Sequence, residues 1–80
     1  MEKSDIISKI REILISILKH SNFEINDQLS AKDVEGWDSL THMLIVTEIE
    51  KSFNIRFKLK ELNKLQNIGS LAELVQIKLQ

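Results

Sequence analysis

The sequence predicts an all-α protein, a small four-helix bundle made of three longer helices and one short helix. Three long segments carry apolar residues at three- and four-residue spacing, which is the period of an amphipathic helix. The polar residues 20–37 separate the first two segments and are predicted to form a long, ordered loop. The chain of 80 residues is expected to form one domain over residues 1–80, because so short a sequence builds only one core.

The first helix is predicted over residues 4–19, with Ser4 or Asp5 as its N-cap. Its apolar stripe consists of Ile6, Ile7, Ile10, Ile13, Leu14, Ile17 and Leu18. Burial has to supply most of its stability, because β-branched isoleucine is a mediocre helix former. In the loop that follows, Ser, Asn, Asp and Gly residues favour local turns over a helix. The predicted anchors of this loop are Phe23, Ile25, Leu29 and Val34, with a short helical turn at residues 31–34.

The second helix is predicted over residues 38–53, with Asp38 as its N-cap and Thr41 in its third position. At about 100° per residue, its apolar side chains separate into two arcs. The longer arc is expected to face the core and consists of Ile45, Val46, Ile49 and Phe53, with His42 at its top. The other arc holds Leu40, Met43, Leu44 and Thr47. An exposed apolar patch beside Ser39 is typical of a contact site, although a wide buried helix could cover both arcs instead.

The remainder of the chain is predicted to form a linker and two helices. Residues 54–57 alternate like a strand but have no partner strand, so we expect an extended linker that buries Ile55 and Phe57. A short third helix over residues 58–65 carries Leu59, Leu62 and Leu65. Asn67 is predicted to cap a last helix over residues 68–79, whose inward side chains are Ile68, Leu71, Ala72, Val75 and Leu79.

Composition excludes several classes of function. The net charge of -1 is unlike that of a nucleic-acid-binding protein. Cysteine is absent, which excludes disulfides, thiolate metal sites and thiol nucleophiles. No signal peptide is recognisable and no stretch approaches the roughly 18 apolar residues of a membrane span, so a cytoplasmic protein is expected. Acidic residues concentrate between residues 24 and 50, which indicates either ordinary solvated charge or a docking surface for basic partners.

Ser39 is the residue on which the function is predicted to depend. Ser39 and His42 are three residues apart on the predicted helix, so they could lie close enough to act as a serine nucleophile and its histidine base. However, no Gly-x-Ser-x-Gly elbow surrounds Ser39, no residue is evident to orient His42, and so small a bundle offers no obvious oxyanion pocket. We expect His42 to pack beneath Trp37 at the start of the helix instead. The protein is therefore predicted not to be an enzyme, and its histidines and carboxylates match no metal-ligand spacing.

The chemistry that remains for Ser39 is the attachment of a group. A residue in the first turn of a helix lies near free backbone N–H groups and the positive end of the helix dipole. Such a site tolerates the negative charge of a phosphodiester, and the group attached to that phosphodiester extends into solvent. Ser39 is therefore predicted to be an attachment point.

Two stretches resemble the acyl carrier protein family: Gly36-Trp37-Asp38-Ser39-Leu40 and Glu48-Ile49-Glu50-Lys51-Ser52-Phe53-Asn54-Ile55. The resemblance covers essentially the whole chain and implies that Ser39 carries a 4′-phosphopantetheine arm, transferred from coenzyme A by a phosphopantetheinyl transferase. The arm would hold acyl or aminoacyl groups as thioesters and deliver them to ligases, acyltransferases and synthases. The protein would be a monomer without nucleic-acid or membrane partners. The implied partner-recognition residues are Asp38, Leu40, Met43, Leu44, Thr47 and Glu48.

The sequence also departs from the family pattern. Members that serve fatty acid synthesis typically have an acidic residue directly after Asp-Ser-Leu and a heavily acidic second helix, whereas this chain has Thr41, His42 and Leu44 there. The linker at residues 55–57 lacks the familiar proline. These differences favour a dedicated freestanding carrier of a specialised pathway, such as polyketide, peptide or cell-surface polysaccharide synthesis. The alternative is an unmodified helical adaptor that binds a partner through Leu40, Met43 and Leu44.

Overall fold

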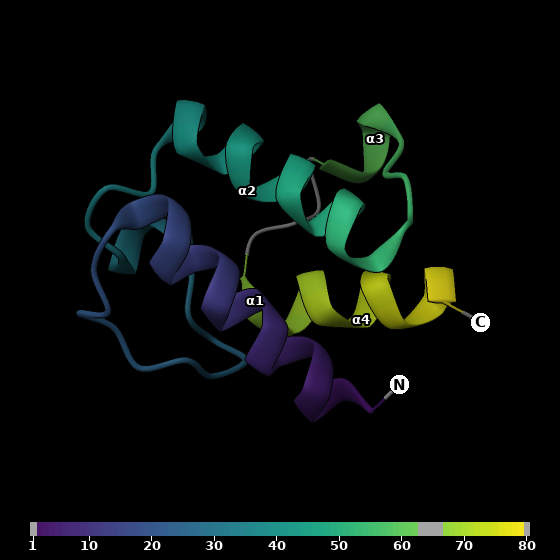
Figure 1. Ribbon diagram of the computed structural model, residues 1–80, viewed down its shortest axis with the longest axis horizontal. Coiled ribbons are helices and arrows are strands. Elements are labelled where there is room, and N and C mark those ends of the chain that lie inside the picture. Colours follow the sequence, from purple (N-terminus) through teal and green to yellow (C-terminus); the bar gives the residue numbers. More distant parts are fainter. Residues whose placement is uncertain (1, 63–66, 80) are drawn as a thin grey trace.

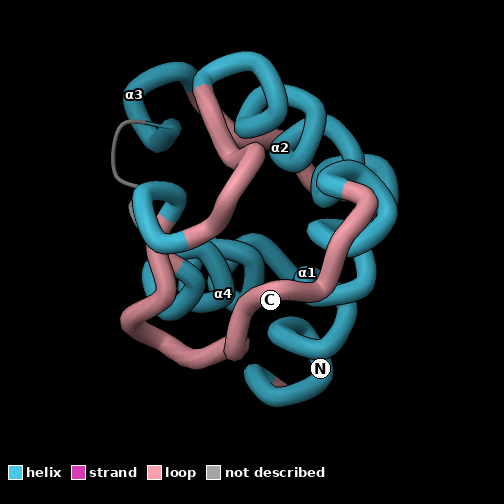
Figure 2. The backbone as a smooth tube through the Cα atoms, turned by 90° about the vertical axis from the view of Figure 1, so that its left-hand side faces the viewer, coloured by secondary structure: helices cyan, strands magenta, loops and turns pink. Residues whose placement is uncertain are grey.

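The computed structural model describes residues 2–62 and 67–79. Its elements are α1 (Lys3–Leu18), the short 3-10 helix η1 (Ala31–Asp33), α2 (Ser39–Phe53), α3 (Leu59–Leu62) and α4 (Ile68–Leu79). Figure 1 shows α2 running across the molecule above α1 and α4, with the short α3 at one side. The start of α1 and the end of α4 lie far from the start of α2, as Figure 1 shows, and Figure 2 shows the same bundle turned by 90°. The predicted all-α, four-helix architecture is confirmed.

The core forms where α1 packs against α2 and α4. Its most deeply buried side chains come from all three helices: Ile6, Ile10, Leu14, Ile45, Ile49, Ile68, Leu71 and Val75. The predicted stripe on α1 is confirmed, because four of its members are buried and the other three are partly buried against the core. Full burial of an aliphatic side chain contributes about 1.5–3 kcal/mol, which offsets the modest helix propensity of isoleucine.

The two arcs predicted on α2 are found on opposite sides of the helix. The longer arc is buried and consists of Ile45, Val46, Ile49 and Phe53. On the other side, Leu40 is 73% exposed, Met43 49% and Leu44 52%. The prediction that these three side chains are exposed is confirmed, and the alternative in which a wide buried helix covers both arcs is wrong.

The long loop between α1 and α2 is ordered by contacts at both of its ends and in its middle. Leu29 and Val34 are buried, while Phe23 and Ile25 are partly buried against the core, so the predicted anchors are confirmed. The loop also supplies acceptors to the start of α4. The backbone N–H groups of Ile68 and Gly69 donate to the carbonyl oxygens of Leu29 and Asp27 at 2.9 and 3.0 Å. These donors have no acceptor inside their own helix, so the loop satisfies them.

Gly69 permits this close approach of loop and helix. A Cβ atom at position 69 would lie 3.1 Å from both the carbonyl oxygen and the Cβ of Asp27. Glycine in a helix costs about 1 kcal/mol relative to alanine, and here the close packing of the loop explains its presence.

The second half of the chain is held by polar side chains. Asn67 Oδ1 accepts a hydrogen bond from the Ser70 backbone N–H at 2.8 Å, which confirms Asn67 as the cap of α4. Ile55 and Phe57 of the predicted linker are partly buried, as expected, but the linker spans residues 55–58 rather than 54–57, because Asn54 is the left-handed C-cap of α2. Glu50 Oε2 fixes the linker by accepting from the Phe57 N–H at 2.8 Å. An ion pair between Lys78 and Glu61, 2.9 Å long, joins α4 to α3.

Three further predictions of detail need correction. α1 begins at Lys3, with Glu2 as an N-cap that makes no side-chain hydrogen bond, so the prediction of Ser4 or Asp5 as the cap is wrong. A side chain caps a helix from an extended residue outside it, and Ser4 and Asp5 already lie in the first turn. Leu79 was expected to point inward but is 38% exposed, because the last turn of α4 extends past the core. α3 begins at Leu59 rather than at 58, and the predicted residues 63–65 lie outside the described part of the chain.

Substitutions on the two faces of α2 test this arrangement. Ile49→Ala is expected to lower the free energy of unfolding by about 2–5 kcal/mol, because it leaves a cavity in the core. Leu44→Ala, on the half-exposed side, is expected to cost much less. Urea denaturation of both variants measures the difference. Equally large losses would show that the buried face of α2 is wrongly assigned.

Candidate functional site

α2 begins with a reciprocal pair of hydrogen bonds between Asp38 and Thr41. The Thr41 backbone N–H donates to Asp38 Oδ1 at 3.0 Å, and the Asp38 backbone N–H donates to Thr41 Oγ1 at 2.8 Å. The bond from the Thr41 N–H lowers the pKa of the Asp38 carboxyl below its ordinary value, which keeps the cap charged at neutral pH. The prediction that Asp38 is the N-cap is confirmed, and Ser39 follows as the first residue of the helix.

Thr41 also holds the turn that precedes the helix. Its hydroxyl donates to the carbonyl oxygen of Gly36 at 2.7 Å while accepting from the Asp38 N–H. Gly36 has φ +88°, a left-handed conformation that glycine adopts without steric cost. A hydroxyl both donates and accepts, whereas an ionised carboxylate only accepts. The threonine therefore joins the turn to the helix in a way that an ionised carboxylate at this position would not.

Trp37 and His42 form a second contact across the helix start. Their rings are stacked, with centroids 6.0 Å apart and planes inclined by 21°. Trp37 Nε1–H donates a hydrogen bond to His42 Nδ1 at 3.0 Å. Trp37 is only 8% exposed, and burial lowers the pKa of His42 below its ordinary value. The predicted packing of His42 beneath Trp37 is confirmed, but its hydrogen bond was not foreseen.

The hydrogen bond from Trp37 argues against a serine–histidine nucleophile. Because Nδ1 of His42 accepts, a neutral His42 carries its proton on Nε2. Neither ring nitrogen is then free to take a proton from the Ser39 hydroxyl, as a general base must. The geometry supports the prediction that Ser39 does not act in catalysis.

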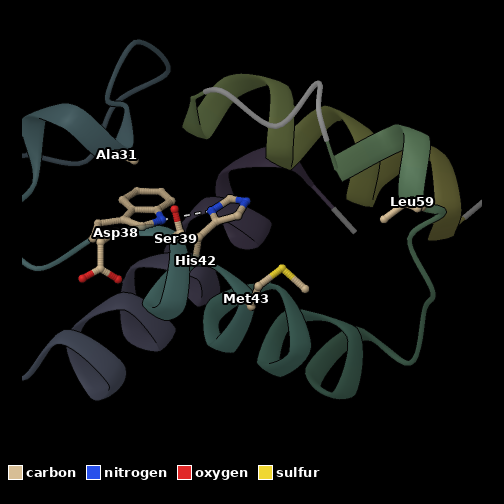
Figure 3. Close-up of a pocket in the computed structure, with 7 residues that line it drawn as sticks. Ala31, Asp38, Ser39, His42, Met43 and Leu59 are labelled. Carbon is tan, nitrogen blue, oxygen red and sulfur yellow. Dashed lines mark hydrogen bonds between the residues drawn. The ribbon is translucent and has the colours of Figure 1, made fainter.

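Ser39 itself is exposed and forms part of the wall of an open groove of about 620 Å³. The other residues that line this groove are Ala31, Trp37, Asp38, His42, Met43 and Leu59. Figure 3 shows Ser39, His42 and Met43 on α2, with Ala31 contributed by η1 and Leu59 by α3. The contributions of Ala31 and Leu59 were missed by the sequence analysis, since only the fold brings three separate elements together here.

A second histidine fixes the end of the long loop. His20 Nε2 lies 2.6 Å from the carbonyl oxygen of Glu35 and donates to it, because His20 Nδ1 accepts from the Asn22 backbone N–H at 3.1 Å. The ring also packs edge-on against Phe23, with centroids 6.0 Å apart. His20 thereby holds the loop one residue before Gly36. The sequence contained no signal for this contact, which joins residues 15 positions apart.

The acidic residues between positions 24 and 50 are largely occupied within the fold. Seven were counted in this segment: Glu24, Asp27, Asp33, Glu35, Asp38, Glu48 and Glu50. Four of their carboxylates accept hydrogen bonds inside the described chain, namely those of Asp27, Asp33, Asp38 and Glu50. Four of the seven acidic side chains therefore have structural roles within the fold, and a hydrogen bond leaves each carboxylate its negative charge.

The six predicted recognition residues are all exposed, but they differ in what they can offer a partner. Asp38 is engaged in the cap, and the Thr47 hydroxyl donates to the Met43 carbonyl oxygen at 2.8 Å. The structure places Asp38 and Met43 on the groove beside Ser39, whereas Leu40 and Leu44 are exposed outside it. Ser39 is therefore flanked by the exposed apolar side chains of Leu40, Met43 and Leu44.

Residues 2–62 and 67–79 contain neither a metal-binding cluster nor a membrane-spanning helix. No cluster of three or more histidine or carboxylate side chains there is arranged to hold a metal ion. Within the same residues, no helix combines the length and the apolar character needed to cross a bilayer.

The chain matches known proteins over most of its length. The family model described as "Phosphopantetheine attachment site" matches residues 8–75. An acyl carrier protein from an Exiguobacterium species is 30% identical over 79 residues, covering 99% of this chain and 100% of that protein. The chain belongs to the acyl carrier protein family.

Two further relatives show the range of this family. The solution structure of a holo acyl carrier protein from Geobacter metallireducens is 36% identical, with a TM-score of 0.84 over 91% of this chain and 84% of that one. A non-reducing polyketide synthase, pkdA of Emericella nidulans, is 36% identical over 72 residues. The match covers 89% of this chain but only 3% of the synthase.

Membership of the acyl carrier protein family confirms the general function inferred from the sequence. Acyl carrier proteins are carriers rather than enzymes, and they use a covalently attached 4′-phosphopantetheine. They work with synthases and other acyl-processing enzymes. The predictions of the family, of the non-enzymatic role and of the cofactor are therefore confirmed.

The role of the Thr41 hydroxyl can be tested by making the same Thr→Val change at position 41 and, as a control, at position 47 of α2. Thr41→Val removes the hydroxyl and leaves the Asp38 N–H and the Gly36 carbonyl without their partner, so it is expected to cost about 1–3 kcal/mol of unfolding free energy. Thr47→Val removes a hydroxyl whose only bond is to its own exposed helix and is expected to cost about 0.5 kcal/mol or less. Urea denaturation compares the two, and equal costs would contradict the proposed role of Thr41.

The Trp37–His42 contact predicts a dependence of stability on pH. Burial holds the pKa of His42 in the folded protein below its value in the unfolded chain, near 6.5. The stability contributed by neutral His42 is therefore present above pH about 6.5 and is lost as the pH falls through the folded-state pKa. Protonated His42 is also unable to accept the bond from Trp37.

We expect the wild-type protein to lose more unfolding free energy between about pH 7 and pH 5 than His42→Gln, whose side-chain amide still offers an acceptor but does not titrate. Denaturation at a series of pH values measures both slopes. Identical slopes would mean that His42 does not contribute to this pH dependence.

Proposed function

We propose that Ser39 is the residue that carries the 4′-phosphopantetheine arm. The observation that supports this most directly is its position as the exposed first residue of α2, directly after a cap that fixes the helix start. The neighbouring His42 is committed to Trp37, so it is not available as a base to activate the Ser39 hydroxyl for catalysis. An exposed hydroxyl without such a base is suited to modification by an external enzyme.

The surroundings of Ser39 fit the phosphodiester that joins such an arm to a serine. The backbone N–H groups of Ser39 and Leu40 lie in the first turn of a 15-residue helix and have no acceptor within that helix, and the Leu40 N–H contributes to the lowered pKa of the Asp38 carboxyl. Free N–H groups and the helix dipole both favour negative charge at this end. The charged Asp38 carboxylate opposes it, but its exposure to water weakens the repulsion.

The attachment reaction that we propose is a transfer from coenzyme A. A phosphopantetheinyl transferase removes the proton of the Ser39 hydroxyl, and the oxygen attacks the phosphorus that bears the pantetheine group. The new Oγ–P bond replaces the pyrophosphate bond of coenzyme A, and adenosine 3′,5′-bisphosphate leaves. The arm ends in a thiol that holds an acyl or aminoacyl cargo as a thioester. The chain, which lacks cysteine, supplies no competing thiol.

We further propose that the partners of this carrier recognise the exposed apolar patch formed by Leu40, Met43 and Leu44, together with Asp38, Thr47 and Glu48 at its edges. Large exposed apolar side chains grouped beside a reactive residue mark interaction sites on small proteins. The partners would be the transferase and the ligase, acyltransferase or synthase that loads and uses the arm. An apolar patch implies docking by burial of apolar surface rather than mainly by charge attraction.

The residue types in the first half of α2 support a pathway other than general fatty acid synthesis. Carriers of fatty acid synthesis typically have acidic residues in this part of the helix. This chain has Thr41, His42 and Leu44 there instead. We propose a dedicated carrier of a specialised biosynthetic pathway, acting as a monomer in the cytoplasm, with residues 1–80 forming one carrier domain. The similarity to a polyketide synthase segment is compatible with this proposal.

The assignment of Ser39 is tested by conversion to the holo form. Wild-type protein incubated with coenzyme A and a broad-specificity phosphopantetheinyl transferase is expected to gain the mass of one phosphopantetheine. Ser39→Ala should gain nothing, and Ser52→Ala, which changes another exposed serine on α2, should be modified like the wild type. Intact-mass spectrometry measures all three.

Two results would contradict the proposal. Absence of the adduct on the wild-type protein, or its presence on Ser39→Ala, would exclude Ser39 as the attachment site. If Ser39→Ala supported growth of the native organism while Leu44→Asp did not, the unmodified adaptor that binds through the apolar patch would be the better account.

A further inference from the structure

The end of α2 that is remote from Ser39 carries a second groove. It encloses about 340 Å³ between the last turns of α2 and the linker that follows the helix. Its lining residues are Thr47, Glu50, Lys51, Asn54, Ile55 and Arg56. Lys51 and Arg56 are both exposed, so this basic groove presents two cations to solvent.

The fold does not neutralise the cations of the basic groove. Neither Lys51 nor Arg56 forms an ion pair within the part of the chain that the structure describes. Glu50 is the one carboxylate that lines the groove, and its Oε2 is fixed by the hydrogen bond from the Phe57 N–H at 2.8 Å. Two cations and one carboxylate leave the groove with a net positive charge.

The residues that follow the groove extend its positive charge. Lys58 and Lys60 are exposed, and Glu61 is the only acidic residue between positions 51 and 61. The Glu61 carboxylate is paired with Lys78 of α4 at 2.9 Å. Figure 1 shows α3 and the end of α2 at one side of the molecule and the start of α2 at the other. Positive charge is therefore concentrated at the side remote from Ser39.

The basic groove continues the exposed stripe of α2 that begins at Leu40. Leu40, Leu44, Thr47 and Lys51 recur at four-, three- and four-residue spacing, which places them within about 60° of one another around the helix. All four are exposed. Lys51 lies about 18 Å from Ser39 along the helix axis, at 1.5 Å per residue. A partner surface of ordinary size, about 800 Å², therefore covers both the apolar patch and the basic groove.

We propose that the enzymes that use this carrier place an aspartate or glutamate side chain in the basic groove, where it pairs with Lys51 and Arg56. The inference rests on the proposed docking of partners at the apolar patch formed by Leu40, Met43 and Leu44. Burial of that patch supplies affinity, whereas a charge pair at one end of the helix fixes the direction in which the partner lies. The guanidinium of Arg56 suits this role, because it binds a carboxylate through two parallel hydrogen bonds.

The distribution of charge along α2 favours an acidic protein surface over a polyanion. A nucleic acid or an anionic membrane presents negative charge everywhere, so it would also meet the exposed carboxylates of Asp38 and Glu48. Asp38 lies about 20 Å from Lys51 along the axis. This separation is more than twice the screening length of about 8 Å at physiological ionic strength, so the two ends of α2 act as separate charges. A partner with carboxylates at one end of its contact surface matches both ends.

A photoreactive residue in the groove identifies what contacts it. With p-benzoylphenylalanine in place of Thr47, irradiation in the native organism is expected to yield a cross-link to a protein peptide that contains Asp or Glu. The same residue in place of Ser8, which is exposed on α1, is the control. Tandem mass spectrometry reads the cross-linked product. A cross-link to nucleic acid or lipid, or none above the control, would overturn the inference.

Binding of the purified partner then measures the charge pair. Lys51→Glu/Arg56→Glu is expected to weaken the Kd by about 10-fold or more, because close opposite charges across an interface couple strongly. Lys9→Glu/Arg11→Glu makes the same change of charge on α1 and should leave the Kd unchanged. Replacing the acidic residue of the cross-linked peptide by lysine should restore binding of the charge-reversed carrier. Isothermal titration calorimetry measures all of these pairs, and urea denaturation confirms that both variants are folded.

The possible failures are distinguishable. A Kd that weakens no more in Lys51→Glu/Arg56→Glu than in the α1 control, or a charge-reversed partner that restores nothing, overturns the charge pair. Leu44→Asp tests the proposed docking patch separately. If Leu44→Asp binds like the wild type while the charge reversal weakens binding, the patch is contradicted and the charge pair is not. Apo protein suffices for these measurements, so they do not depend on the attachment at Ser39, which intact mass tests on its own.

Discussion

The reciprocal hydrogen bonds between Asp38 and Thr41 are the constraint on which the functional site depends. They start α2 at Ser39, and the second bond of the Thr41 hydroxyl joins the helix to the turn at Gly36. With the start of the helix fixed, its period of about 3.6 residues determines the rest. Ile45 and Ile49 then face the core, while Ser39 is held in the exposed first turn. A cap at another residue would move the first turn of the helix, with its free N–H groups, away from Ser39.

The long polar loop between α1 and α2 also stabilises the functional site, because it fixes the turn that precedes Ser39. His20 donates to the carbonyl oxygen of Glu35, and the loop carbonyls of Asp27 and Leu29 accept from the first N–H groups of α4. Leu29 and Val34 add burial to these polar contacts. A loop of this length usually costs considerable conformational entropy to order. Its contacts with α1 and α4 offset that cost and give the turn before Ser39 a defined position.

The sequence predicted those features that depend on local periodicity and failed where distant segments meet. The buried and exposed faces of α2 follow from residue spacing, and the caps at Asp38 and Asn67 follow from residue type. Ser4 and Asp5 have equally good capping side chains, but α1 begins at Lys3 and both lie inside the helix. The need for Gly69, the contact of His20 with Glu35, and the groove wall at Leu59 arise only from tertiary structure. The packing of Trp37 on His42 could be predicted, whereas the tautomer it selects required the geometry.

In the proposed function, Ser39 is a tether whose chemistry is supplied from outside the chain, and the state of the protein in its own cell tests this most directly. Protein purified from the native organism is digested without reduction, and the peptide that contains Ser39 is sequenced by mass spectrometry. We expect a phosphopantetheine on Ser39, with the cargo attached through its thiol where loading has occurred. A Ser39 peptide that is found only in unmodified form, or a phosphopantetheine on another serine, would contradict the account.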